Sequence, residues 1–289
     1  MERYTIRDFE KEFQTDAACL EWLRQYLYPN GIWCKQCRTI TKHHRVTKRR
    51  SYSCNRCGHH VHPTAGTIYH KSPTPLKLWF YAIYLMASTR CGISAKQLER
   101  ELGVTYKTAW RMFHQIRSML SENGRALSGK VEIDDTYIGE TKPGKRGRGA
   151  AGKTIVMGMV ERKGRIVARV VPNMSRQSVL PIIQSKVTPH QTTVFTDELE
   201  TYRPLSTRYT HAQIQHNLKV YVRGDVHTNT IEGFWSQIKH GLRGIYRAVK
   251  PSYLQAYVNE YAFRYNHRND AEPMFKAFLG QVRACGSPA

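Results

Sequence analysis

Acidic residues are scarce in this chain of 289 residues, and one long stretch has none. Asp and Glu together number 22 against 45 Lys and Arg, which gives a formal net charge of +23 with His neutral. Between Trp22 and Leu98 there is no Asp or Glu, whereas 13 Lys or Arg occur there. A solvated surface normally mixes both signs of charge. The imbalance therefore favours a polyanionic partner, and nucleic acid is the leading candidate.

Long apolar runs are missing as well. None reaches the roughly 18–20 residues that a membrane-spanning helix needs, and the first residues, MERYTIRDFEKEF, are charged rather than the apolar core of a secretion signal. We therefore expect a cytoplasmic protein with no membrane partner. Hydrophobic residues make up 40% of the chain, which predicts a folded protein rather than a disordered polycation, and the length predicts two domains.

The cysteines are odd in number, which together with the missing secretion signal argues against a disulfide framework. Four of the seven form two Cys-x2-Cys pairs separated by sixteen residues, Cys34 with Cys37 and Cys54 with Cys57. Each pair can place two thiolates on a tight turn, and two such turns complete a tetrahedral shell for one structural zinc ion. The spacing predicts a zinc ribbon; buried thiols or a redox pair are the alternatives.

A basic segment lies between the cysteine pairs and includes Lys48, Arg49 and Arg50 beside Tyr52. Cations on a hairpin can neutralise DNA phosphates. We expect a phosphate-contacting arm here, with an ordinary solvated loop as the alternative.

Residues 76–119 have the pattern of three helices. An apolar helix over 76–86 is followed by a helix that Ser94 can cap, a turn at Gly103, and a further helix over 106–119. Two helices joined by a short Gly turn fit a helix-turn-helix, whose second helix would present Lys107 and Arg111 to DNA. An ordinary helical hairpin is the alternative.

The pattern changes from helices to strands after the polar break at 121–129. Strands are predicted over 131–138, 154–161, 165–171, 192–196 and 210–215, and helices over 175–187 and from 230 onward. This succession predicts a mixed α/β domain, a sheet flanked by helices. The loop 143–153 is rich in Gly and basic, with Lys145, Arg146 and Arg148; it is either a segment that binds DNA or a plain insertion.

Three acids occupy special positions in this domain. Asp134 lies within the first strand, Asp197 at the exit of the fourth, and Glu232 in the first turns of the late helix. Carboxylates there are costly to bury without a cation. Together they could hold two divalent ions about 3.5–4 Å apart for phosphoryl transfer. Taken singly, each could be an ordinary turn or helix-start residue.

Helical periodicity adds weight to Glu232. At 100° per residue, Ile231, Phe234 and Ile238 form a buried stripe, and Glu232 and Lys239 share the adjoining face two turns apart. A Lys in that position could hold a DNA phosphate next to the metals.

The ordered set of these segments resembles the DDE insertion-sequence transposases with an amino-terminal zinc ribbon. The segments that carry the resemblance are Val131-Glu-Ile-Asp134-Asp-Thr-Tyr-Ile-Gly139, Thr196-Asp197, Asn229-Thr-Ile-Glu232-Gly-Phe-Trp-Ser-Gln-Ile-Lys239 and Tyr261-Ala-Phe-Arg-Tyr-Asn-His-Arg268. The resemblance implies an RNase H-like catalytic domain with two Mg²⁺ ions (Mn²⁺ possible in their place) and transposon-end DNA as substrate.

Carried over by this resemblance, Asp134, Asp197 and Glu232 are the metal ligands and Lys239 contacts DNA. Asn229 competes with Glu232 as third ligand, and Asp135 stands where the family usually has Glu. The first cysteine turn reads Cys-Lys-Gln-Cys-Arg and lacks the family's usual Pro and Gly.

The expected protein is a prokaryotic, nucleoid-associated DNA transposase. It would bind inverted-repeat ends as a homodimer or larger oligomer, cut DNA strands and join the 3′-OH ends to target DNA. The expected parts are an N-terminal helix and zinc ribbon (1–72), a helix-turn-helix region (73–125), the catalytic domain (128–275) and a tail (276–289). A DNA-binding regulator with an inactive core and a nuclease without strand transfer are the alternatives.

Overall fold

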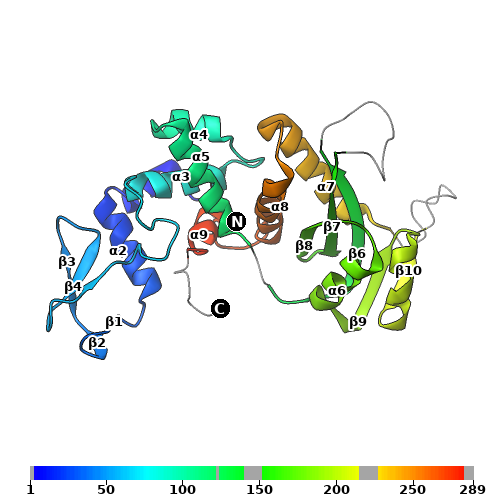
Figure 1. Cartoon of the computed structure of the whole chain (residues 1–289), viewed down its shortest axis with the longest axis horizontal. Coiled ribbons are helices and arrows are strands. Elements are labelled where there is room, and N and C mark those ends of the chain that lie inside the picture. Colours follow the sequence, from blue (N-terminus) through cyan, green and yellow to red (C-terminus); the bar gives the residue numbers. More distant parts are fainter. Residues whose placement is uncertain (1–2, 122–123, 140–151, 215–226, 283–289) are drawn as a thin grey trace. The chain divides into compact units, whose positions relative to one another are not determined.

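The protein divides into two compact units in a computed structural model of the chain, which describes residues 3–121, 124–139, 152–214 and 227–282. The first unit joins residues 1–119 to residues 270–289, and the second comprises residues 120–269 (Figure 1). Each unit is described by itself below. No helix in these described ranges is long and apolar enough to cross a membrane.

The first unit begins with two helices and a pair of small antiparallel sheets. Thr5 and Thr15 cap the two helices through their side chains. The elements are α1 (Ile6–Glu12), α2 (Asp16–Leu27), the paired strands β1 (Ile32–Cys34) and β2 (Thr39–Thr41), and the sheet β3 (His43–Val46), β4 (Ser51–Cys54) and β5 (His60–Val61) in that order. Cys34 ends β1 and Cys54 ends β4, and Cys37 and Cys57 lie in the turns that follow these two strands.

Three helices follow where the sequence predicts them: α3 (Leu76–Ser88), α4 (Ala95–Leu102) and α5 (Tyr106–Ser118). Ser94 and Thr105 cap α4 and α5, and Gly103 between them has a φ of 62°, in the left-handed region that favours glycine. The helices and the Gly turn are confirmed, and their role as a DNA-binding helix-turn-helix stays a prediction.

The C-terminal part of the chain corrects one predicted boundary. We expected a tail from 276, yet α9 (Met274–Leu279) is a helix of the first unit, and Phe278 and Leu279 are fully buried. The ring of Phe275 lies 4.8 Å from that of Tyr4 and 5.8 Å from that of Phe9. An aromatic cluster therefore holds α9 in the first unit, and the second unit ends before it.

A network of polar side chains joins the hairpin between β3 and β4 to the helices. The carboxylate of Asp16 accepts hydrogen bonds from the backbone N–H of Leu76 and Lys77 at the start of α3, both at 2.9 Å. Arg50 donates to Asp16 and to the carbonyls of Ser72 and Thr74, the last two at 2.9 Å. The guanidinium of Arg50 is thus engaged within the unit.

We expect Arg50→Ala to lower the free energy of unfolding by about 1.5–3 kcal/mol, because it removes charge-assisted hydrogen bonds to three partners. Arg49, its exposed neighbour, is the matched control. Arg49→Ala should change stability by less than about 0.5 kcal/mol. Urea unfolding of both variants measures the contrast, and equal midpoints would contradict it.

The second unit is built on a five-stranded mixed sheet with the strand order β10-β9-β6-β7-β8. β6, β7 and β8 are antiparallel neighbours, whereas β9 is parallel to β6 and β10 is parallel to β9. This is the expected RNase H-like topology. The strands are β6 (Leu127–Ile138), β7 (Thr154–Glu161), β8 (Ile166–Val171), β9 (Val187–Thr196) and β10 (Thr210–Gln213).

Side chains alternate across the sheet, so its two faces differ. Val131 and Ile133 of β6 belong to a buried apolar cluster that includes Val179 and Ile183 of α6 (Arg176–Lys186). Glu132 and Asp134 point to the other face, which α7 (Asn229–Gly241) covers. The 3₁₀ helix η1 (Glu200–Thr207) completes the apolar side, and α7 continues into a π-helical turn (Leu242–Tyr246) before α8 (Pro251–Asn266).

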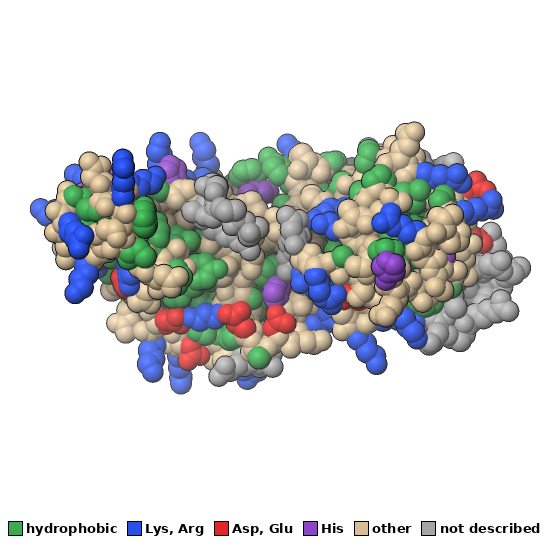
Figure 2. Space-filling model, turned by 90° about the horizontal axis from the view of Figure 1, so that it is seen from below, with side chains coloured by type: hydrophobic (Ala, Val, Ile, Leu, Met, Phe, Trp, Pro, Cys, Tyr) green, Lys and Arg blue, Asp and Glu red, His purple; other side chains and the backbone are tan. Residues whose placement is uncertain are grey.

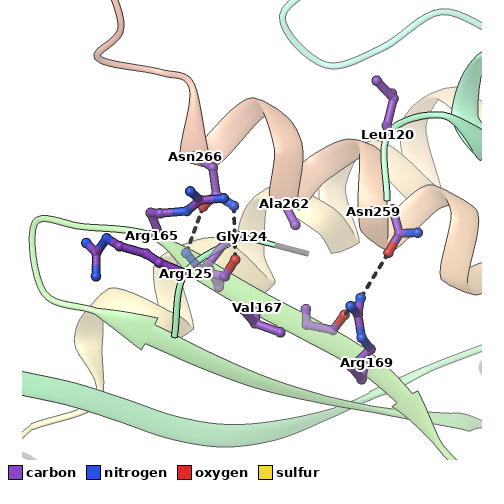
Figure 3. A pocket seen from close by; sticks show the side chains of 11 residues that line it. Leu120, Gly124, Arg125, Arg165, Val167, Arg169, Asn259, Ala262 and Asn266 are labelled. Atoms are coloured by element: carbon purple, nitrogen blue, oxygen red, sulfur yellow. Dashed lines mark hydrogen bonds between the residues drawn. The ribbon is translucent and has the colours of Figure 1, made fainter. Parts of the chain in front are cut away.

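The edge strand β8 is covered by amide side chains of α8 instead of another strand. Asn266 accepts from the N–H of Ile166 at 2.7 Å and donates to its carbonyl at 3.1 Å, and Gln255 bonds the N–H of Val170 and the carbonyl of Ala168 in the same way. Figure 3 shows Asn266 and Asn259 of α8 aimed at this strand around a cavity of about 20 Å³, room for one water. Helix α8 therefore covers this sheet edge, with Asn266 as the contribution of the Tyr261–Arg268 segment.

Candidate metal and DNA site

Three carboxylates meet at one edge of the sheet. One oxygen from each of Asp134, Asp135 and Asp197 lies within 4.8 Å of the others. The parallel pairing of β6 with β9 explains this, because Glu132 stands opposite Phe195. Asp134 and Asp135 follow Glu132 within β6, and Asp197 follows directly after the end of β9. The structure thus brings together the predicted Asp134 and Asp197 and adds Asp135 to them.

Asp134 is held by an aromatic side chain that the sequence did not single out. Trp235 of α7 donates from its indole Nε1 to Oδ2 of Asp134 at 3.0 Å. Gly158 of β7 lies directly opposite Asp134, and a Cβ there would come within 2.6 Å of the Trp235 ring. A glycine at 158 is therefore required for the indole to reach the carboxylate.

The electrostatics of the cluster are unfavourable without a cation. Burial, and next the charge of Asp135, raise the pKa of Asp134 to about 7, and Asp197 acts in the same direction. Carboxylate oxygens are the ligands preferred by Mg²⁺ and Mn²⁺. The donor set of Asp134, Asp135 and Asp197 consequently fits divalent ions of this kind.

Glu132, two residues before Asp134, anchors the start of α7. Its side chain is fully buried, and its carboxylate accepts from the backbone N–H of Thr230 at 2.9 Å and of Ile231 at 3.1 Å. Arg162 donates to it at 2.7 Å and to the carbonyl of His227 at 2.8 Å. A carboxylate at a helix N-terminus satisfies the free N–H groups and complements the helix dipole. Glu132 thereby fixes α7 against β6.

The predicted third ligand stands apart from the aspartates. Glu232 is exposed, accepts from the hydroxyl of Thr228 at 3.1 Å, and is not a member of the 4.8 Å cluster. Asn229, its competitor, is also exposed. The predicted buried stripe of Ile231, Phe234 and Ile238 agrees with the structure. The choice between Glu232 and Asn229 stays a prediction.

Lys239 is half-buried, and the charges of Asp134, Arg243 and Lys153 all act on it. Burial is the main cause that lowers the pKa of Lys239, the charge of Arg243 adds to it, and the charge of Asp134 opposes it. Lys239 is therefore close enough to Asp134 to sense its charge. Its predicted contact with a DNA phosphate stays a prediction.

The four cysteines predicted as zinc ligands also come together. Their sulfurs all lie within 4.8 Å of one another, with Cys34 and Cys57 at 3.5 Å and Cys37 and Cys54 at 3.9 Å. In both turns the N–H of the residue after the second cysteine bonds the carbonyl of the first, at 2.8 Å for Arg38 and 2.9 Å for Gly58. This arrangement fits one structural zinc ion.

The two turns differ in the residue that occupies their left-handed position. Arg38 has a φ of 52° and Gly58 a φ of 73°, although a side chain is disfavoured there by roughly 1 kcal/mol. We expect Arg38→Gly to raise the free energy of unfolding of the zinc-bound chain by about 0.5–1 kcal/mol, and Gly58→Ala to lower it by a similar amount. Chelator competition and thermal unfolding measure both variants. Changes in stability of the same sign for Arg38→Gly and Gly58→Ala would contradict the expectation.

The residues predicted to bind DNA fall into three groups. Lys48, Arg49 and Lys107 are exposed. Arg50 is engaged as described above, and Arg111 donates to the hydroxyl of Ser72 at 3.1 Å and packs over the Trp79 ring at 5.8 Å. DNA contact by these two partly exposed residues stays a prediction. Lys145, Arg146 and Arg148 lie outside the described residues. Figure 2 shows Lys and Arg side chains spread over the visible surface of both units.

Comparison with known proteins matches both units. Residues 126–266 match the family model of the ISXO2-like transposase domain, and residues 14–60 match the transposase zinc-ribbon domain. An uncharacterized protein in transposable element ISH50 of Halobacterium salinarum is 28% identical over 270 residues, covering 86% of this chain and 91% of that protein. An uncharacterized transposase-like protein of Haemophilus influenzae is 28% identical over 106 residues, covering 36% of this chain and 84% of that protein.

Among solved structures, the Mos1 transposase paired-end complex with left transposon end is similar at a TM-score of 0.31 and 10% identity, covering 70% of this chain and 74% of that one. The two matched domains, in this order, define a transposase with an amino-terminal zinc ribbon. Within that class, residues 126–266 are similar to the ISXO2-like transposase domain, and the ISH50 protein is similar over most of the chain.

Proposed function

We propose that this transposase cuts DNA at the ends of its element and joins the freed 3′-OH ends to target DNA in one active site. The observation that carries the proposal is the meeting of Asp134, Asp135 and Asp197 at one edge of the sheet, with Lys239 near enough to sense the charge of Asp134. Both reactions are phosphoryl transfers with an oxygen nucleophile, so one site can serve both.

Asp134 and Asp197, with Glu232 or Asn229, are the proposed ligands of two divalent ions, Mg²⁺ or Mn²⁺. Bound there, such ions lower the pKa of an attacking hydroxyl and stabilise the leaving 3′ oxygen. Trp235 and Glu132 keep Asp134 and α7 in place. Lys239 holds the DNA backbone beside the carboxylates.

End recognition is assigned to the first unit, where Lys107 of α5 and the hairpin residues Lys48 and Arg49 are exposed cations. Lys145, Arg146 and Arg148 would add backbone contacts near the catalytic unit. Two ends have to be joined in concert, so we propose that the protein acts as a homodimer or larger oligomer on inverted-repeat DNA in the cytoplasm of a prokaryote.

A strand-transfer assay tests this proposal. Labelled DNA from either side of the gene, a target plasmid and Mg²⁺ are incubated with the protein, and cleaved and joined products are separated on a gel. We expect both products from the wild type and neither from Asp197→Asn. Glu200→Gln is the matched control, because it removes a carboxylate charge from an exposed residue of the same unit.

The two alternatives give other patterns. Cleavage without joined product would favour a nuclease, and end binding without either product would favour a regulator with an inactive core. Zinc content is measured on the same preparations. Less than about one zinc per chain, unchanged by Cys54→Ser, would contradict the zinc assignment.

A further inference from the structure

A small pocket with a basic lining lies just beyond the C-terminal end of α7. Tyr137 and Gly139 from the end of β6 form one wall, and Lys239, Arg243 and Arg247 supply the charge of the other. We propose that this pocket binds one backbone phosphate of the DNA, within about three nucleotides of the phosphate that is cut. The inference rests on the proposed function and extends its substrate site beyond Lys239.

The chemistry of the lining points to an anion. The pocket encloses about 120 Å³, which is several times what one water needs. All three charged side chains in its lining are cations, and within the described parts of the chain none of them forms an ion pair with a carboxylate. Unpaired cations that converge on a concave surface are the arrangement that neutralises a phosphate.

The backbone at this pocket is strained, as backbones at binding sites often are. α7 ends in a π-helical turn, Leu242–Tyr246, and Arg247 follows it with a φ of 58° and a ψ of −59°. The N–H of Ala248 bonds the carbonyl of Tyr246 at 2.7 Å, which closes a tight γ-turn centred on Arg247. A non-glycine residue rarely adopts this turn, and here it places a guanidinium at the pocket.

The pocket lies a few nucleotide lengths from the three aspartates. Tyr137 lies three residues after Asp134 on β6, a distance of about 10 Å along a strand. One DNA strand advances about 3.4 Å per nucleotide along its axis. Lys239 borders the pocket and senses both Asp134 and Arg243. A strand whose scissile phosphate lies at the aspartates can therefore place a phosphate within three nucleotides of it in the pocket.

The test compares Arg243→Gln, Arg247→Gln and their combination with Lys163→Gln. Lys163 is an exposed cation in the turn after β7, whereas Tyr137 pairs with Ile155 at the start of that strand. About 20 Å of strand and part of a turn therefore separate the control from the pocket. Binding of a random-sequence duplex is measured in Ca²⁺ over a range of salt. We expect the double variant to bind roughly tenfold more weakly, and its log–log salt slope to be about 1 smaller in magnitude.

A second measurement locates the phosphate. Single uncharged methylphosphonate linkages are placed in turn on both sides of the cut in end DNA that the wild type cleaves. One linkage within three nucleotides of the cut should weaken wild-type binding and leave the double variant unaffected. Equal losses for both proteins at every linkage, or a salt slope like that of Lys163→Gln, would overturn the inference. An acidic protein partner as the true occupant would also leave the salt slope for DNA unchanged.

The two proposals fail in different ways. A wild type that cleaves no DNA would contradict the proposed function, yet the duplex-binding measurement would still test the pocket. A wild type that cleaves and joins DNA, with Arg243→Gln/Arg247→Gln indistinguishable from it in binding, would contradict only the pocket. Thermal unfolding of each variant checks that the fold is retained.

Discussion

Glu132→Ala is expected to remove most of the cleavage activity and to lower the free energy of unfolding by about 3–5 kcal/mol, as for one partner removed from a buried ion pair. Arg162, whose side chain is only 13% exposed, would lose the acceptor 2.7 Å away. The first N–H groups of α7 would lose theirs as well. Because α7 carries both Trp235 and Lys239, its displacement would disturb the cluster of three aspartates.

Glu232→Ala is the matched comparison, since Glu232 is an exposed glutamate of the same unit. Its loss should change stability by less than about 0.5 kcal/mol, whatever it does to cleavage. Glu132→Gln keeps an acceptor oxygen, so its loss in free energy of unfolding should lie between those of Glu132→Ala and Glu232→Ala. Urea unfolding and the cleavage assay are the measurements. A Glu132→Ala protein with the wild-type midpoint would show that the buried carboxylate does not anchor the helix.

Asp134→Asn is expected to abolish cleavage and, in metal-free protein, to stabilise the fold in a pH-dependent way. The pKa of Asp134 is about 7 in the folded chain and about 3.8 in the unfolded chain. Its contribution to stability is complete below about pH 4 and is lost as the pH rises toward 7, because the folded state then has to hold a buried charge. Asn carries no such charge.

The unfolding temperature of the variant should therefore exceed that of the wild type more at pH 8 than at pH 4. The difference corresponds to about 2 kcal/mol, which allows for the partial exposure of the side chain. Mg²⁺ or Mn²⁺ should raise the wild-type value at pH 8 more than that of the variant. Glu200→Gln, in which an exposed charge is removed, should follow the wild type at every pH. Parallel curves for Asp134→Asn and the wild type would contradict the expectation.

Patterns with a strict local cause were predictable from the sequence. Two Cys-x2-Cys pairs define a zinc shell by spacing, and alternation of apolar residues located the strands that bring Asp134 and Asp197 to one edge. The contribution of Glu132 was not predictable. Alternation places it on the same face as Asp134, but nothing local indicates that the start of α7, about a hundred residues later, returns to that carboxylate.

The sequence also could not show which of several neighbouring basic residues are exposed and which are held by other side chains. Lys48, Arg49 and Arg50 form one basic run, and only the fold reveals that Arg50 points to Asp16 while the other two are exposed. Gly158 is a similar case. A side chain at this position would clash with Trp235, which belongs to another element, so the requirement for glycine cannot be read from the strand alone. Such pairwise requirements arise from tertiary contacts, which periodicity does not encode.

The position of α9 determines when the first unit can finish folding during translation. Its aromatic residue Phe275 completes the cluster with Tyr4 and Phe9, although the whole second unit is translated between them. Domains generally fold as they leave the ribosome, at about 5–20 residues per second. The first unit therefore lacks its last helix until the unit that carries the aspartates has been synthesised. A nascent chain interrupted before residue 274 would thus lack a finished first unit.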